Sequence, residues 1–264
     1  MGLPRGERIR RHQWYARLLG VCLLVLLCFA LPSQWRSLSS IGYGLLPVML
    51  GLGLGRARHS VEFLGPGWVF RLVGLATTAS SVVWAVTPLA IRTTGVPLLV
   101  LWALFISMSL VRLLRMLAQE TEVGGNVLMG AAAGYLLLGL TAGLLFAALE
   151  TVHPGSFAYA RGGAGSVLLP RGNLNMPDPL SAVWSLDFVR LNYFAFITLT
   201  STGFGDITPH TPQAQMATIV VAILGNFYIA VVMGILISRL TVQESAEADP
   251  PEAPQADAGR RDLH

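Results

Sequence analysis

Charged side chains are scarce in this sequence of 264 residues. Asp, Glu, Lys and Arg together make up 12% of it, about half the share that is usual in globular proteins, whereas apolar residues make up 53%. A soluble domain of this size could not cover its surface with so few charges. The composition therefore largely excludes soluble enzymes and nucleic-acid-binding proteins, and it predicts an integral membrane protein.

Lysine is absent, and there are only two cysteines. Cys22 and Cys28 lie in one apolar run, and in a helix they would be about 9 Å apart along the axis, which is too far for a disulfide. All 18 basic residues are arginines, and they gather in short clusters between apolar runs. This distribution indicates loops that face the cytoplasm rather than an anionic binding partner.

Six apolar segments divide the chain. A helix needs about 20 residues to span a bilayer, so the last four segments are long enough by themselves, and the first two need flanking aromatic residues at the interfaces. The first segment could instead be a cleaved signal peptide, but its poor small-residue cleavage site favours a retained span. The segments cover residues 18–31, 41–55, 68–91, 96–117, 127–149 and 213–240.

The arginines also predict the orientation of these segments. The N-terminus is strongly basic, and further pairs lie between the second and third segments and before the fifth, whereas the alternate loops hold single or scattered arginines. Because positive charge is retained on the cytoplasmic side, we expect both termini in the cytoplasm. The chain is then a multi-pass protein of the plasma or inner cell membrane.

One stretch between the fifth and sixth segments does not fit a crossing. Residues 188–197 form an apolar run that is too short to span the bilayer, and Thr-Leu-Thr-Ser-Thr-Gly-Phe-Gly-Asp follows at residues 198–206. Non-helical backbone at membrane depth is tolerated only where it lines protein or water. The run is therefore expected to be re-entrant, and the residues after it are expected to line a pathway.

Rings of backbone carbonyls from several copies of such a segment can replace the hydration shell of a potassium ion. Successive carbonyls can point to one side only if the backbone alternates between right- and left-handed conformations. That alternation requires positive φ at some positions, which predicts positive φ at Gly203 and Gly205. Asp206 would add a carboxylate at the outer mouth.

Residues 198–206 resemble the selectivity filter of the tetrameric potassium channels, and residues 187–240 resemble their pore helix, filter and inner helix. The resemblance implies potassium sites at the carbonyls of Ser201, Thr202, Gly203 and Phe204 and at the Ser201 hydroxyl. We call residues 200–206 the filter segment; its members are Thr200, Ser201, Thr202, Gly203, Phe204, Gly205 and Asp206. Ser201 and Thr202 replace the Thr and Val that are commoner in the family.

The same resemblance assigns supporting roles outside the filter segment. Tyr193 and Phe194, together with Phe204, resemble the aromatic cuff that holds the filter open, and Thr198 belongs to the filter support. Gly225 falls at the position of the family's inner-helix hinge. Asn226, which follows it, either lines the cavity or bonds to a neighbouring helix.

The fourth segment differs from a voltage-sensing helix. Residues 96–111 hold no charge, and no Asp or Glu lies within the first four segments. Arg112 and Arg115 are at the cytoplasmic end, where we expect them to orient the helix and to contact lipid headgroups; Glu120 and Glu122 could pair with them. The fifth segment has a face of small residues that should admit a neighbouring helix closely: Gly130, Gly134, Gly139 and Gly143.

These patterns together predict an all-α membrane protein with six transmembrane helices, a re-entrant pore helix and filter between the last two, and a homotetrameric pore. The expected domains are a basic cytoplasmic N-terminus (1–17), a four-span domain without sensor charges (18–117), a pore domain (118–240) and a disordered cytoplasmic tail (241–264).

The predicted function is passive, potassium-selective permeation across the lipid bilayer. K⁺ is the permeant ion, and we expect no cofactor, no enzymatic step and no nucleic-acid partner. Two alternatives stay open: a poorly selective cation channel, and a non-conducting membrane subunit that regulates a partner.

Overall fold

The computed structural model describes residues 5–30, 46–48, 50–51, 67–86, 96–120, 124–159 and 188–248, and these are mostly helical. Two short strands, β1 (Phe157–Tyr159) and β2 (Ile207–Pro209), pair antiparallel. The helices are α1 (Arg5–Phe29), α3 (Gly67–Val86), α4 (Val96–Ala118), α5 (Gly125–Val152), α7 (Phe188–Leu199), α8 (Pro212–Phe227), the π-helical η4 (Tyr228–Met233) and α9 (Gly234–Ala248).

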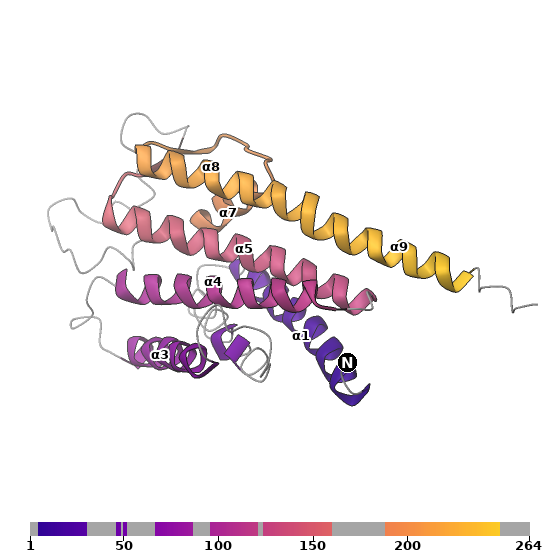
Figure 1. The fold of residues 1–264 in the computed structure, drawn as a ribbon. Helices are drawn as coiled ribbons and strands as arrows, with labels where there is room; N and C mark the ends of the chain where they lie inside the picture. Colours follow the sequence, from indigo (N-terminus) through magenta and orange to yellow (C-terminus); the bar gives the residue numbers. More distant parts are fainter. Residues whose placement is uncertain are drawn as a thin grey trace, which may run out of the picture.

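The long helix α5 is the centre of the arrangement (Figure 1). It packs against α1, α4 and α7, and it also contacts α8 and η4. Helix α3 packs against α4. Because α8, η4 and α9 follow one another without a break, they form one long rod that runs beside α5.

The small-residue face predicted for α5 is confirmed. The four glycines of this face are all buried: Gly130, Gly134, Gly139 and Gly143. A Cβ added at Gly139 would overlap the Phe196 ring of α7, and one added at Gly143 would overlap the Asn192 amide of the same helix. The missing side chains therefore let α7 lie directly on the α5 backbone.

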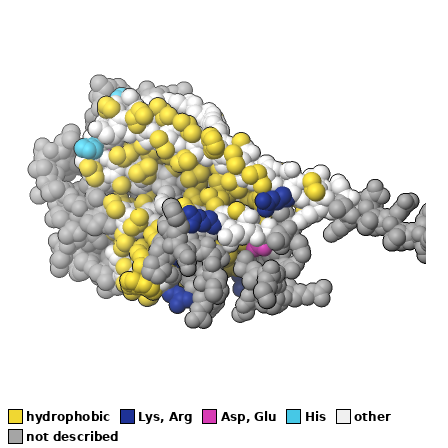
Figure 2. Space-filling model, in the orientation of Figure 1, with side chains coloured by type: hydrophobic (Ala, Val, Ile, Leu, Met, Phe, Trp, Pro, Cys, Tyr) yellow, Lys and Arg dark blue, Asp and Glu magenta, His cyan; other side chains and the backbone are white. Residues whose placement is uncertain are grey.

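Three helices in the described part of the chain are long and apolar enough to cross a membrane: Leu98–Ala118, Gly125–Val152 and Pro212–Gln243. They correspond to the fourth, fifth and sixth predicted segments. The apolar part of α1, Gln13–Phe29, is shorter, and most of the second predicted segment lies outside the described residues. Hydrophobic side chains cover most of the described part of the face in Figure 2, and charged ones are few.

Helices extend beyond the predicted boundaries at both ends of the chain. Helix α1 begins at Arg5, within the basic N-terminal region. Helix α9 continues to Ala248 rather than ending near Leu240. The added residues at the C-terminal end are mostly Ala, Glu and Gln, which are good helix formers, and the next proline is Pro250, which disfavours helical backbone at the residue before it.

Arg112 does not extend toward headgroups in this structure. Its side chain is only 5% exposed, and its guanidinium lies 4.1 Å from the centroid of the Phe70 ring on α3. Phe70 in turn stacks on Phe105 with 5.1 Å between ring centroids. A delocalised cation is stabilised over an aromatic face, so this buried position holds α3 against α4.

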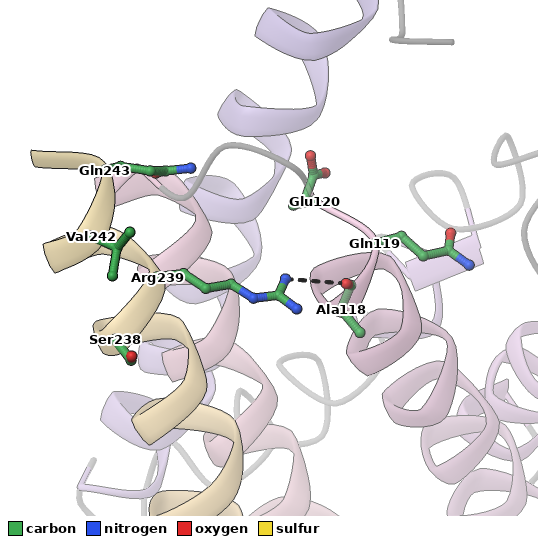
Figure 3. A pocket seen from close by; sticks show the side chains of 7 residues that line it. All are labelled: Ala118, Gln119, Glu120, Ser238, Arg239, Val242 and Gln243. Carbon is green, nitrogen blue, oxygen red and sulfur yellow. Dashed lines mark hydrogen bonds between the residues drawn. The ribbon is translucent and has the colours of Figure 1, made fainter. Parts of the chain in front are cut away.

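The end of α4 meets α9 across an open pocket (Figure 3). Arg239 reaches across it and donates from Nη1 to the carbonyl of Ala118 at 3.4 Å. A cation is favourable there because the last carbonyls of a helix carry partial negative charge. Glu120, on the same connection, accepts from the Tyr15 hydroxyl of α1 at 3.1 Å. These contacts fasten the connection between α4 and α5 to both α1 and α9.

Candidate functional site: the segment between α7 and α8

Helix α7 is short and deeply packed. Its apolar side chains lie against α5, and seven of its twelve residues are buried: Leu191, Asn192, Phe194, Ala195, Ile197, Thr198 and Leu199. At its C-terminal end the Tyr135 hydroxyl of α5 donates to the Leu199 carbonyl at 3.3 Å. The end of α7 is thereby fixed to α5 at the point where the filter segment begins.

The backbone of the filter segment alternates in hand. Ser201, Gly203 and Gly205 have φ of +56°, +51° and +74°, so every second residue is in the left-handed region. Positive φ at the two glycines agrees with the sequence prediction. Positive φ at Ser201 was not predicted, because a residue with a Cβ adopts this conformation at a cost of roughly 1–2 kcal/mol.

Backbone amides of the filter segment bond back to the last turn of α7. The Ile197 carbonyl accepts from the N–H of Thr202 at 2.9 Å and from that of Gly203 at 3.2 Å, and the Thr198 carbonyl accepts from the N–H of Ser201 at 2.9 Å. These bonds satisfy helix-end carbonyls that lack an intrahelical partner. They also hold the left-handed conformation of Ser201 in place.

The three consecutive hydroxyls of the segment form two sets of contacts, with Thr200 and Thr202 in one set and Ser201 in the other. Thr200 donates to the Phe196 carbonyl at 2.8 Å, and its Oγ1 lies 2.8 Å from that of Thr202. The Ser201 hydroxyl instead meets the Asn226 amide of α8: its Oγ is 3.3 Å from Oδ1 and 3.1 Å from Nδ2. Asn226 therefore bonds to the filter segment of its own chain rather than to a neighbouring helix, and its predicted place in the lining of a cavity stays a prediction.

The aromatic residues predicted to support the filter differ in burial: Phe194 is buried, whereas Tyr193 and Phe204 are exposed. Phe194 is buried in a cluster with Phe146 of α5 and Phe157 of β1, with ring centroids 5.3 Å from each. Tyr193 is exposed, and its hydroxyl lies near the Asp206 carboxylate at the end of the filter segment. Phe204 is 69% exposed in the single chain. A cuff built from these rings would therefore need other copies of the chain, and it stays a prediction.

A buried carboxylate that the sequence reading missed shapes the chain before β1. Glu150, near the end of α5, is 0% exposed, and its two oxygens accept from the N–H groups of Gly155 and Phe157 at 2.9 Å each. These bonds lead the chain into β1, which pairs with β2 directly after Asp206. Glu150 thus fixes the strand that supports the exit of the filter segment.

Replacing Glu150 by Gln should destabilise this exit, because an amide NH₂ would face a backbone N–H donor in a buried site. We expect a loss of about 1–3 kcal/mol in the free energy of unfolding. The measurement is the melting temperature of the purified protein in detergent. Thr151→Val is the matched control, since among the described residues the Thr151 hydroxyl bonds only to the Ala147 carbonyl within α5. Equal melting temperatures for the two variants would contradict the role of Glu150.

Helix α8 begins immediately after β2. Thr211 is its N-cap, accepting from the Ala214 N–H through Oγ1 at 3.3 Å, and Pro212 occupies the first turn. Further along, a Cβ added at Gly225 would overlap the Leu199 carbonyl oxygen. The rod therefore touches the backbone of the α7 end at this glycine.

The predicted hinge coincides with regular helix in this structure. Helix α8 continues through Gly225 to Phe227, and the irregular π-helical geometry lies in η4. There the Tyr228 hydroxyl donates to the Ala131 carbonyl of α5 at 2.6 Å, and its ring lies 5.5 Å from that of Tyr135. The rod is thus attached to α5 just beyond the glycine.

The filter segment forms an exposed polar surface on the single chain. Every residue of the filter segment is exposed in the single chain, although the helix that carries it is buried. Backbone groups with alternating orientation, hydroxyls and one carboxylate can together bind a cation that has lost its water. Glu150 and Tyr135 are the contributors that no local sequence pattern indicates, and the bond of Asn226 to Ser201 is likewise not indicated by one.

Comparison with known proteins finds a similarity to ion channels over this segment. Residues 165–242 match the ion-channel family, a range that includes α7, the filter segment, β2, α8, η4 and part of α9. The chain is also similar to the human voltage-gated inwardly rectifying potassium channel KCNH6, with 29% identity over 127 residues. This alignment covers 47% of the chain and 13% of the human protein, so the chain spans a small part of that relative's length.

Proposed function

We propose that this chain is the subunit of a homotetrameric, potassium-selective channel of the cell membrane, with the filter segment as its selectivity filter. The observation that carries the proposal is the alternation of positive φ at Ser201, Gly203 and Gly205 in an exposed polar segment at the end of a buried short helix. The ion-channel match over the same residues and the similarity to a human potassium channel support it.

The exposure of the site supports assembly from several copies. One chain provides only one side of an ion's ligand shell, and carbonyls from symmetric copies complete it in such filters. The rod also has a row of exposed apolar side chains that lipid or neighbouring subunits can cover: Met216, Ile219, Val220, Ile223, Leu224 and Phe227. Permeation through this pore is passive and has no enzymatic step.

Potassium uptake into liposomes tests the proposal. Liposomes that contain the purified protein are loaded with KCl and diluted into NaCl. These liposomes should take up tracer potassium, whereas protein-free liposomes should not. Equal uptake of sodium tracer would indicate a poorly selective cation channel. Absence of uptake of either ion at any voltage would favour a non-conducting regulatory subunit and would contradict the proposal.

We further expect weak voltage dependence. Moving one charge through the whole field contributes about 2.3 kcal/mol per 100 mV, so steep gating needs several charges that move together. The apolar length of α4 carries none, and Arg112 is held in contact with Phe70 near its C-terminal end.

Open probability against potential in planar bilayers measures this dependence. The curve should be shallow, and Arg115→Gln should leave its slope unchanged. Arg112→Gln should lower the melting temperature through the lost contact with Phe70, again without changing the slope. A steep curve that either substitution flattens would make α4 a voltage sensor.

A further inference from the structure

Ser201 is the one residue of the filter segment with a hydroxyl that faces the rod formed by α8, η4 and α9. The neighbouring hydroxyls of Thr200 and Thr202 lie against each other, and that of Thr200 also bonds to α7. The backbone alternation turns Ser201 to the opposite side, where both ends of the Asn226 amide lie within 3.3 Å of its Oγ.

The approach of Asn226 depends on the residue before it. At Gly225 the rod touches the Leu199 carbonyl, and any side chain there would hold the two backbones apart. This close contact lets the short Asn226 side chain reach across to Ser201. The pair is therefore a consequence of how α8 is seated on the end of α7.

A serine hydroxyl has one proton and two lone pairs, and it can ligate a cation only if the proton points away from the ion. When Ser201 donates to Asn226 Oδ1, both lone pairs are left for an ion on the other side. When Asn226 Nδ2 donates to Ser201, one lone pair is used and the proton is free to turn toward the ion. The amide thus controls how well this oxygen binds a cation.

We infer that Asn226 is a positioning residue for the innermost ion site: its amide oxygen accepts the Ser201 proton and directs the hydroxyl oxygen toward the permeating cation. The inference rests on the proposed function, because it assigns Ser201 to an ion site. It goes beyond that proposal by naming a residue outside the filter segment that sets the affinity of one site.

Block by Ba²⁺ applied from the cytoplasmic side is a suitable readout. This ion is close to K⁺ in size and carries twice the charge, so it binds the same oxygen ligands, and it meets the innermost site first. Asn226→Leu keeps the number and branching of the side-chain heavy atoms but removes the hydrogen bond. We expect it to weaken Ba²⁺ block by about tenfold, which is the effect of losing one hydrogen bond.

A double-mutant cycle separates positioning from a general effect on the pore. In a Ser201→Ala background, which itself weakens block, Asn226→Leu should have almost no further effect, because its target hydroxyl is gone. Thr218→Val is the control on the same helix, since the Thr218 hydroxyl donates to Ala214 within α8. It should leave block unchanged.

The outcomes distinguish this inference from the proposed function. Lack of potassium conduction in the unmodified protein would overturn both. Normal conduction with unchanged Ba²⁺ block in Asn226→Leu, or additive effects with Ser201→Ala, would overturn the inference alone. If Asn226→Leu does not assemble, Asn226→Ala and Asn226→Ser provide the same cycle with smaller side chains. The Asn226→Ser variant should retain part of the Ba²⁺ block, because its hydroxyl can still accept a hydrogen bond.

Discussion

Gly203→Ala should abolish potassium-selective conduction while leaving the protein folded. Gly203 has φ of +51°, and an L-residue with a Cβ adopts this conformation at a cost of roughly 1–2 kcal/mol. The cost applies to every subunit of a tetramer. Among the described residues, no atom lies within 4 Å of a Cβ built at this position. The expected defect is therefore one of backbone conformation, which redirects the carbonyls, and not one of packing.

The measurement is tracer potassium and sodium uptake into liposomes, with the oligomeric state checked by size-exclusion chromatography. Gly20→Ala is the matched control, because Gly20 lies in regular helix α1 with open space around it in the described part of the chain. The control should conduct as the unmodified protein does. A Gly203→Ala protein with unchanged uptake and unchanged preference for potassium would refute the assignment of the filter.

Gly225→Ala should be the most disruptive substitution in the rod. Its Cβ would overlap the Leu199 carbonyl oxygen, a backbone atom that cannot move aside without moving α7. Overpacking of this kind typically costs about 1–3 kcal/mol per site. We expect a lower melting temperature and loss of potassium uptake, because the end of α7 carries the filter segment.

A second substitution separates packing from hinge motion as the role of this glycine. Gly234 lies further along the rod in helical conformation, with φ of −59° and no described atom within 4 Å of a Cβ built there. Gly234→Ala should therefore change stability little. If Gly225 served only as a hinge, both alanine variants would fold equally well and differ only in channel opening.

The local features of the site could be predicted from the sequence. The two glycines at positions 203 and 205 indicated positive φ without any knowledge of the fold, since only glycine adopts that conformation without cost. The small residues of α5 likewise indicated a close helix contact, because their spacing places them on one face. In both cases the information lies within one short segment.

The contacts that join distant segments could not be predicted. The Ser201–Asn226 pair depends on how α8 is seated on α7, and the bonds of Glu150 depend on the path of the turn before β1. The burial of Arg112 reflects the position of Phe70, which lies on another helix. Each of these contacts depends on how two elements are placed relative to each other. No periodicity in the sequence predicts that placement.

The reversal potential of single channels with K⁺ on one side and Na⁺ on the other tests the central claim most directly. The current through purified protein in planar bilayers should reverse far toward the potassium equilibrium potential. The reversal potential should shift by about 59 mV for each tenfold preference in permeability. Gly203→Ala should lose this shift or the current itself. A reversal potential near zero in the unmodified protein, with currents of equal size for both ions, would contradict a potassium-selective filter at residues 200–206.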